Sequence, residues 1–301
     1  MRVVFLGTGG SWPSKCRNLP GIAIKMNGEV ILFDCGEGSQ MQLMRTSLSF
    51  MKIKKIFITH FHADHFLGIP GLIQTMYLND RKDKIEIYGP KGLKKIISSL
   101  LCVGYFTPTF DVEINEISNN EIIGKNYVVR AIEVEHNIPT LAYSIEENER
   151  PGKFNLEKAK KLGIPEGPLY RKLQRGEEIV IGKKVIKPQM VMGKQRKGRK
   201  IVYSGDTKPT SKLIEFGMGA DVLIHDATTD SKFEAKANEY GHSSSRQAAE
   251  IAKKCNASFL FLFHISPRYK DATSIENEAK EIFKNSKVAE DLMEFDVELR
   301  E

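Results

Sequence analysis

A short histidine-rich motif constrains this chain more than any other feature. The motif His60-Phe61-His62-Ala63-Asp64-His65 follows an apolar stretch that is typical of a β-strand and precedes a helical pattern beginning near Phe66. Imidazole nitrogen and carboxylate oxygen are ligands that Zn²⁺ prefers, and one turn cannot wrap four of them around a single tetrahedral ion. The motif therefore predicts two metal ions at a strand end. An incidental histidine cluster is the alternative, which the interior position of the motif disfavours.

Short apolar stretches bounded by Gly, Pro, Asn or Asp recur along the chain and predict β-strands. These stretches cover residues 3–6, 22–25, 30–33, 55–58, 85–88, 112–117, 128–134, 141–145, 201–203, 222–224 and 259–263. Helical periodicity predicts helices at residues 38–49, 66–78, 92–101, 211–216, 244–254 and 273–282. This mixture predicts an α/β fold, with helices and strands arranged in layers around a central sheet.

Composition excludes several classes of protein. The chain has 301 residues, of which 41% are hydrophobic, so it can bury a full core. No apolar run is long enough to span a membrane. The run at residues 3–6 is too short for the core of a signal peptide, so a cytoplasmic location is expected. The four cysteines are far apart and form no Cys-x-x-Cys pair, which predicts neither a disulfide framework nor a cysteine-based zinc site.

The positive charge of the chain is concentrated in one segment. The net charge is +7, and residues 150–200 contain 16 Lys and Arg against 4 Glu, so the remainder is slightly acidic. Pro and Gly are frequent in this segment, and one short helix is expected at residues 156–162, ending at Gly163. The segment is either a solvated, poorly ordered loop or an electrostatic footprint for a polyanion. Because so long a loop is unusual inside a compact domain, we expect a projecting functional insertion.

The sequence His-x-His-x-Asp-His after a strand resembles the metallo-β-lactamase superfamily, whose four-layer αββα sandwich holds two metals at one sheet edge. That superfamily takes three further ligands from strand ends, and this chain has matching residues in the same order: His136, Asp206 and His264. The resemblance implies one metal held by His60, His62, His136 and Asp206. It implies a second metal held by Asp64, His65, Asp206 and His264. Two Zn²⁺ are implied, although such sites also accept Mn²⁺ or Fe.

Two further motifs resemble the ribonuclease Z family of this superfamily. His225-Asp226-Ala227-Thr228 and His242-Ser243-Ser244 are similar to its His-Glu-Ala-Thr and His-Ser-Thr motifs. The resemblance implies that His242 is a general acid oriented by Asp226, which is one methylene shorter than the usual Glu. Asp64 would ligate a metal and also accept the proton of the nucleophile. His225 is expected to be a structural histidine at a strand end.

Three features favour an RNA substrate. The sequence Pro13-Ser14-Lys15-Cys16-Arg17-Asn18 matches the family's Pro-x-Lys-x-Arg-Asn loop and implies phosphate contacts, although a plain surface turn is the alternative. The sequence from His264 to Tyr269 resembles the family's His-Phe-Ser-x-Arg-Tyr motif. The basic segment resembles the family's flexible arm and implies salt-sensitive binding of the tRNA elbow. The implied substrate-binding residues are Lys15, Arg17, Asn18, Ser39, Gln40, Gly167, Pro168, Arg268 and Tyr269.

The resemblance covers essentially the whole chain. It implies one metallo-β-lactamase-like domain over residues 1–301, with an inserted flexible arm at residues 150–199 that binds tRNA. The implied activity is a zinc-dependent endoribonuclease that removes the 3′ trailer of precursor tRNA, leaving a tRNA 3′-hydroxyl and a 5′-phosphorylated trailer. A cytoplasmic homodimer is implied, with neither a membrane nor DNA as a partner.

Two alternatives stay open. One is another hydrolase of the same fold, acting on other phosphodiesters, thioesters, lactones or sulfate esters, which should lack the basic arm and the Pro-x-Lys-x-Arg-Asn loop. The other is a non-catalytic RNA-binding module that holds zinc for structure. Structural zinc sites are usually closed and rich in Cys, whereas this set is built from His and Asp.

Overall fold

Two seven-stranded sheets form the main body of the protein. The computed structural model describes residues 1–103, 105 and 107–299. It divides into one compact unit of Met1–Glu146 with Lys200–Glu298 and a second that contains Glu147–Arg199. In strand order, the first sheet of the larger unit consists of β16 (Glu294–Asp296), β1 (Arg2–Gly7), β2 (Gly21–Met26), β3 (Glu29–Phe33), β4 (Ile53–Phe57), β5 (Ile85–Gly89) and β6 (Val112–Glu116). The second consists of β15 (Ser286–Val288), β14 (Phe259–Phe263), β13 (Val222–Asp226), β12 (Lys200–Tyr203), β9 (Thr140–Glu147), β8 (Tyr127–Val134) and β7 (Glu121–Gly124).

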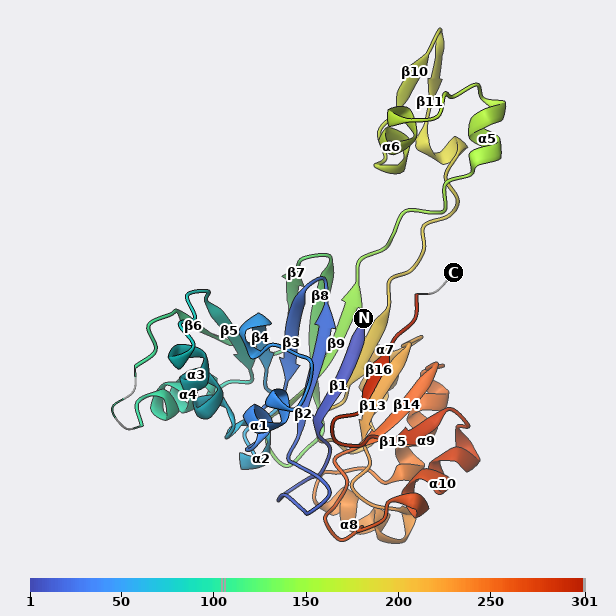
Figure 1. Ribbon diagram of the computed structural model, residues 1–301. Coiled ribbons are helices and arrows are strands. Elements are labelled where there is room, and N and C mark those ends of the chain that lie inside the picture. The colour runs from blue at the N-terminus through green and yellow to red at the C-terminus, as the bar shows by residue number, and fades with distance from the viewer. Residues whose placement is uncertain (104, 106, 300–301) are drawn as a thin grey trace. The chain divides into compact units, whose positions relative to one another are not determined.

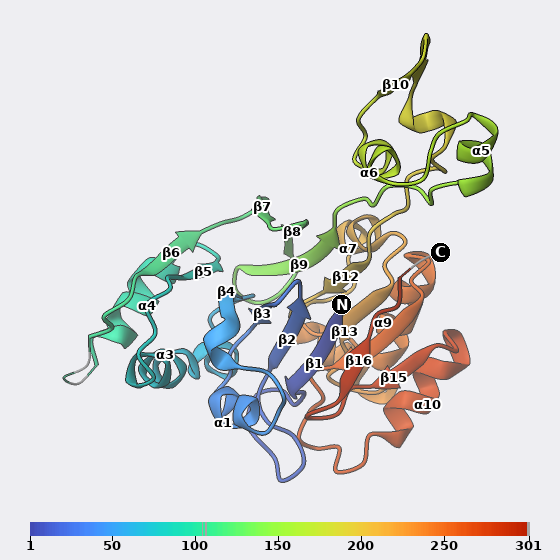
Figure 2. The same ribbon diagram turned by 45° about the horizontal axis from the view of Figure 1, so that its top comes forward.

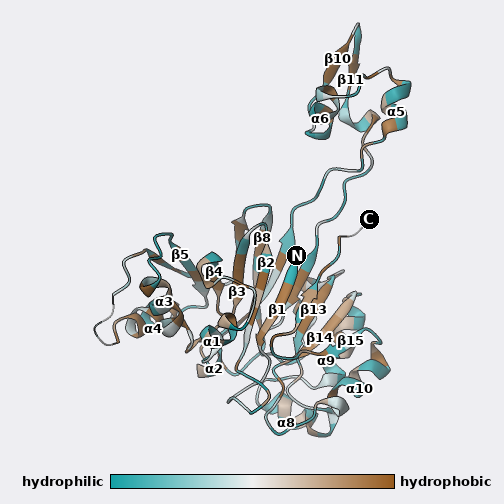
Figure 3. Cartoon of the chain, in the orientation of Figure 1, coloured by the Kyte–Doolittle hydropathy of each residue, from teal (hydrophilic) through white to brown (hydrophobic). Residues whose placement is uncertain are grey.

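An aromatic core holds the two sheets together. Phe5 of the first sheet contacts Phe261 of the second, with ring centroids 4.8 Å apart, and Phe57 contacts Tyr143 at 5.3 Å. These rings belong to one buried cluster that takes side chains from both sheets. Hydrophobic stretches run along β3, β13 and β14 (Figure 3). Burial of these large rings is the main force that fixes one sheet against the other.

Helices cover the outer face of each sheet (Figures 1 and 2). The first sheet packs on α1 (Ser39–Met44), α3 (Ile69–Leu78) and α4 (Leu93–Leu101) through a second buried cluster. The second sheet packs on α7 (Ser211–Gly217), α9 (Ser245–Lys254) and α10 (Thr273–Ile282) through a third. The predicted four-layer αββα sandwich is confirmed. No helix in the described part of the chain is long and apolar enough to cross a bilayer.

The helices predicted at residues 66–78 and 38–49 differ from the observed ones. The first is split into α2 (Ala63–Phe66) and α3, because the backbone at Gly68 lies against Gly36 so closely that a Cβ there would be 2.2 Å from its carbonyl oxygen. Asp64 and His65 therefore lie in a helical turn and not in a loop. The second helix stops at Met44 because the Thr46 hydroxyl donates to the carbonyl of Leu43 and competes with the helical pattern.

The basic segment is a folded unit, so its interpretation as a poorly ordered loop is wrong. It contains α5 (Leu156–Lys161), α6 (Pro168–Gln174) and an antiparallel hairpin of β10 (Ile179–Ile181) and β11 (Lys184–Ile186). These elements pack around a small apolar core of their own that includes Ile164 and Leu173. Only the first helix was predicted. The strands, of three residues each, are too short for periodicity to reveal, as are β7, β15 and β16 of the larger unit.

Candidate metal centre

Loops and turns after four strands carry the residues that the sequence singled out. His60 and His62 follow β4, His136 follows β8, Asp206 follows β12 and His264 follows β14. The structure brings seven side chains together, here called the metal cluster: His60, His62, Asp64, His65, His136, Asp206 and His264. His60 and His264 of this group are 204 residues apart in the sequence, and the folding of both sheets brings them together.

One half of the metal cluster is built around His62. Its Nδ1 lies 3.0 Å from Nε2 of His60 and 3.1 Å from Nε2 of His136. Nε2 of His60 lies 3.5 Å from Oδ2 of Asp206. The ligand atoms of these four residues all lie within 4.8 Å of one another. This is the set that the resemblance implied for the first metal.

The other half is built around two carboxylates. Nε2 of His65 and Nε2 of His264 each lie 3.3 Å from Oδ2 of Asp206. Oδ2 of Asp64 lies 3.7 Å from Nε2 of His65 and 3.4 Å from Nε2 of His264. Asp206 therefore faces both halves, in the place that a bridging ligand would take.

Hydrogen bonds at the outer nitrogens fix the tautomers of two histidines directly. Nδ1 of His136 donates to the carbonyl of Gly241 at 2.8 Å, and Nδ1 of His65 donates to Asp34 at 2.7 Å. In a neutral ring the Nε2 lone pair then faces the cluster. Only glycine fits at position 241, because its backbone lies against the His136 ring and a Cβ there would be 2.5 Å from Nδ1 of His136.

Two threonines fix the tautomers of His60 and His264. The Thr59 hydroxyl donates to Asp34 at 2.9 Å, so it accepts from Nδ1 of His60 at 2.9 Å. In the same way the Thr228 hydroxyl donates to Asp226 at 2.7 Å and accepts from Nδ1 of His264 at 3.0 Å. Each hydroxyl has one proton, so its carboxylate partner decides the direction of the second bond.

The donor set fits divalent metal ions. Nε2 of His60 and Nε2 of His136 both direct lone pairs at Nδ1 of His62, and one proton cannot satisfy three nitrogens. Nε2 of His65 and Oδ1 of Asp206 are buried without a hydrogen-bond partner among the described residues. Buried polar atoms are normally paired, so this arrangement needs cations at its centre.

The pKa shifts of the clustered side chains also favour a bound cation. Burial by itself would raise the pKa of Asp206, but the imidazoles of His264 and His65 outweigh it and hold that pKa well below its usual range. Burial would lower the pKa of His65, but the carboxylates of Asp206 and Asp34 raise it well above its usual range. The negative potential that favours a proton on His65 also favours a metal cation there. Burial lowers the pKa of His60, so its ring is neutral and free to ligate.

The two residues predicted as an acid and its orienting partner are in contact. Nδ1 of His242 lies 2.9 Å from Oδ2 of Asp226 and 3.9 Å from Oδ2 of Asp206. Asp226 at the end of β13 reaches the ring despite its short side chain. Burial would lower the pKa of His242, but pairing with Asp226 outweighs it and raises the pKa to about 9. His225 is fully buried and its Nδ1 lies 2.7 Å from the carbonyl of Asp226.

The loop at residues 8–18 uses two of its predicted phosphate ligands internally. Nη1 of Arg17 donates to the Thr8 hydroxyl and to the carbonyl of Ala289, each at 2.6 Å. Nδ2 of Asn18 donates to the carbonyl of Glu37 at 3.1 Å. Both side chains therefore anchor the loop, whereas Lys15 is exposed.

The other predicted substrate residues are dispersed. Ser39 is buried, and Gln40 donates to Thr75. The Arg268 guanidinium lies over the Phe233 ring, 4.6 Å from its centroid, and the Tyr269 hydroxyl accepts from the backbone of Asp230 at 3.1 Å. Gly167 and Pro168 lie at the exposed start of α6 in the second unit, which is described by itself.

Two carboxylates that sequence reasoning missed organise this region. Asp34 accepts from the backbone and hydroxyl of Thr59, from Tyr203 and from His65, all while fully buried. Asp291 accepts from the Thr8 hydroxyl at 2.7 Å and from the backbone of Asn18 at 2.6 Å. Asp34 directly follows the strand at 30–33, which is the one local signal that could have drawn attention to it.

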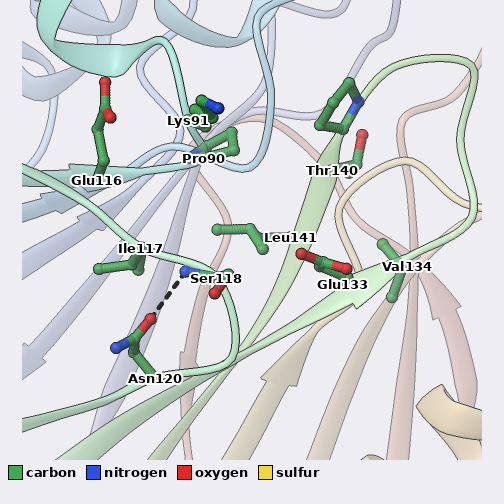
Figure 4. Close-up of a pocket in the computed structure, with 11 residues that line it drawn as sticks. Pro90, Lys91, Glu116, Ile117, Ser118, Asn120, Glu133, Val134, Thr140 and Leu141 are labelled. Atoms are coloured by element: carbon green, nitrogen blue, oxygen red, sulfur yellow. Dashed lines mark hydrogen bonds between the residues drawn. The ribbon is translucent and has the colours of Figure 1, made fainter.

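A cavity of about 620 Å³ lies beside the segment that carries His136 (Figure 4). Its lining comes from the end of β6, the end of β8 and the start of β9, and includes Lys91, Glu133 and Thr140. None of the residues that line it was predicted as a site residue.

We expect Asp34→Asn to weaken metal binding by roughly 10- to 100-fold, the usual cost of losing a partner that orients a metal-binding histidine. Both oxygens of Asp34 accept hydrogen bonds, from Thr59 at one and from His65 and Tyr203 at the other, so an amide must turn its NH2 group toward a donor at one of these positions and weakens the support of the present His65 tautomer. The measurement is metal content after dialysis against graded chelator. The exposed Asp83→Asn is the matched control, and equal metal retention by both variants would contradict the role of Asp34.

Comparisons with known proteins agree with this geometry. The family described as Anti-Pycsar protein Apyc1 matches residues 1–142, and the Beta-lactamase superfamily domain matches residues 190–265. Ribonuclease Z of Methanosarcina mazei is 47% identical over 302 residues, covering 100% of this chain and 99% of the relative. Ribonuclease Z of Archaeoglobus fulgidus is 45% identical, covering 98% of this chain and 97% of the relative.

Solved structures show the same fold. The short form of human tRNase Z superposes with a TM-score of 0.73 at 31% identity, covering 99% of this chain and 100% of that one. The metallo-β-lactamase fold protein YhfI of Bacillus subtilis superposes with a TM-score of 0.72 at 17% identity, with 98% of each chain covered. The sandwich is thus a metallo-β-lactamase fold, and the full-length identity to curated relatives shows that this chain belongs to the ribonuclease Z family.

Proposed function

We propose that this protein is a metal-dependent endoribonuclease that removes the 3′ trailer of precursor tRNA by hydrolysing one phosphodiester bond. The observation that carries the proposal is the position of the His242–Asp226 pair, whose Nδ1 lies 3.9 Å from the shared carboxylate Asp206. A cluster that fits two cations lies beside a histidine held in its protonated form. Membership of the ribonuclease Z family supplies the substrate class.

The metal cluster supports the assignment of seven ligands. His60, His62 and His136 would hold one ion, Asp64, His65 and His264 the other, and Asp206 would bridge them. When bound, two divalent ions, proposed as Zn²⁺, polarise the phosphodiester and make water acidic enough to attack it near neutral pH. Oδ2 of Asp64 accepts a hydrogen bond from the backbone of Ser11 at 2.7 Å, which orients this carboxylate to take up the proton of the attacking water.

His242 completes the reaction at the other side of the phosphorus. Its Nδ1 proton is engaged by Asp226, so its Nε2 proton is available for the leaving 3′ oxygen of the tRNA. The phosphate stays on the trailer, and the tRNA ends in a 3′-hydroxyl. Asp226 acts on His242 by holding its orientation and its charge, and Thr228 fixes Asp226 in turn.

His65→Ala should abolish cleavage of precursor tRNA while leaving RNA affinity within about threefold of wild type. The substitution removes a buried ligand of the metal cluster but no exposed cation. Gel-based mapping of products measures the first effect and filter binding the second, with the exposed Lys25→Ala as control. Cleavage that persists in His65→Ala, or in chelator-stripped wild type, would disprove the metal-dependent mechanism.

The pH profile tests the role of Asp226. His242 must be protonated to act as an acid, and its pKa is about 9, so activity should fall as pH rises through about 9. Asp226→Asn removes the charge that raises this pKa. We expect the alkaline limb of the kcat profile to move to lower pH and kcat at neutral pH to fall by roughly 10²- to 10⁴-fold. An unchanged alkaline limb would assign the acid to another group.

We also propose that the folded basic unit, residues 147–199, is a tRNA-binding arm. Its exposed Lys and Arg side chains would neutralise phosphates, giving salt-sensitive affinity with little sequence reading. Gly167 and Pro168 at the start of α6 are part of this proposal. The resemblance further implies a homodimer and a cytoplasmic location, and both stay predictions.

Deletion of Pro151–Gly198 should impair cleavage of precursor tRNA and spare hydrolysis of bis(p-nitrophenyl) phosphate. The larger unit should still fold, because the two ends of the deleted segment lie side by side. The backbone of Glu147 donates to the carbonyl of Arg199 at 2.9 Å, and the three residues left between them can form a hairpin loop. Circular dichroism and thermal unfolding check the fold. Equal loss of activity on both substrates would refute the arm's role.

A further inference from the structure

Trp12 is the one tryptophan of the chain, and it is 63% exposed on the loop at residues 8–18. A tryptophan so exposed leaves a large apolar surface in water, and tryptophan is usually well buried. Nothing in the metal mechanism described above uses it. Its exposed ring is therefore free to contact a partner.

The position of Trp12 is fixed relative to the metal cluster. The backbone of the preceding residue, Ser11, donates to Oδ2 of Asp64 at 2.7 Å. Consecutive Cα atoms are only about 3.8 Å apart, so Trp12 is attached directly to a residue whose backbone contacts a proposed metal ligand. The backbone of Trp12 itself donates to the carbonyl of Gly10 at 2.9 Å. Gly10 in turn packs on His264, since a Cβ there would lie 2.3 Å from the imidazole.

The far end of the loop is pinned as firmly. Gly9 donates to the carbonyl of Asn18 at 2.9 Å and closes the loop at its base. Asp291 holds Asn18 and Thr8, and Arg17 is tied to Ala289. An aromatic ring on an anchored backbone loses little conformational entropy when a partner stacks on it, which favours binding.

Charge beside the loop indicates what that partner is. A cavity of about 420 Å³ between the loop and α1 is lined by three cations, Lys15, Arg17 and Arg45. The carboxylate at this cavity, Asp291, is already engaged by Thr8 and Asn18. The Lys15 ammonium has no ion pair within the described residues, so it is available to a phosphate. An exposed ring followed by a free cation matches a nucleotide, with a base to stack and a phosphate to neutralise.

We propose that Trp12 is a base-stacking subsite that holds a nucleobase of the RNA next to the scissile phosphate. Lys15 holds the phosphate of the same strand, and Asp291 and Arg17 are positioning residues that keep the loop in place. Stacking is tolerant of sequence because every base has a π-face, so the subsite places the strand without selecting the base. This inference rests on the proposed function and adds to it the contact that seats the strand at the metals.

The single tryptophan provides a direct test, because all tryptophan fluorescence of the protein comes from this position. The titration uses metal-loaded His242→Gln, which should cut too slowly to consume the substrate, and precursor tRNA. We expect strong quenching of the emission on binding. We also expect Trp12→Leu to raise KM for precursor tRNA by roughly 5- to 100-fold with kcat and metal content little changed, and Trp12→Phe to stay within about threefold of wild type.

A cycle with modified RNA locates the stacked base. Precursor tRNAs with one abasic nucleotide at each of the positions flanking the cut are assayed with wild type and Trp12→Leu. At the stacked position the abasic RNA and Trp12→Leu should each weaken binding, but together no more than either alone. The exposed Tyr105→Leu is the control for loss of a surface aromatic side chain and should match wild type.

Three outcomes would overturn the proposal: emission unchanged at saturating RNA, additive effects at every abasic position, or a Trp12→Leu variant with wild-type KM. A change in oligomeric state of Trp12→Leu, with unchanged RNA affinity, would assign the ring to a contact between copies of the chain and would also overturn it. Failure of the proposed function looks different, because wild type itself would then leave precursor tRNA uncut.

Discussion

Imidazole nitrogens that direct their lone pairs at one another stay together only if cations lie among them. That constraint governs this structure. The backbone of Gly241, the carboxylate of Asp34 and the hydroxyls of Thr59 and Thr228 each engage the outer nitrogen of one histidine. The inner nitrogens then converge on Asp206 and His62. These outer partners thus orient the inner nitrogens toward the places that cations would take.

The same outer hydrogen bonds also link the metal cluster to His242, the proposed acid. Asp226 binds His242 with one oxygen and Thr228 with the other, and Thr228 holds His264. Orientation of a proposed metal ligand and of the proposed proton donor therefore depends on one buried carboxylate. This explains how Asp serves where the family usually has Glu: β13 ends with its backbone close enough for the shorter side chain to make both contacts.

In the loop at residues 8–18, some side chains hold the loop in place and others are exposed. Arg17 and Asn18 use their polar groups to fix the loop, whereas Lys15 and Trp12 are exposed. The loop is anchored at one end by Asp291, near the C-terminus of the chain, and at the other by Asp64 in the metal cluster. The proposed RNA contacts of Trp12 and Lys15 are therefore carried by a loop whose backbone is held at both ends.

Much of the fold was predictable because strands and helices leave local patterns. The α/β class, the layered sandwich and most strand positions follow from apolar periodicity, and α10 has the predicted bounds. The break between α2 and α3 was not predictable, since it depends on the close approach of Gly68 to Gly36. The inserted segment and its first helix were predicted, but the rest of its internal fold was not, because its strands are short and its charge is typical of a disordered segment.

The sequence by itself determined which donors are present and in what order: His60, His62, Asp64 and His65 in one motif, then His136, Asp206 and His264 after later strands. Only the tertiary structure decided that they meet, which tautomer each ring adopts, and that Arg17 serves the loop. The reason is physical. Residue chemistry is local, but Asp291 lies 273 residues from Asn18, and no periodicity in the chain encodes a contact that exists only once two sheets have packed together.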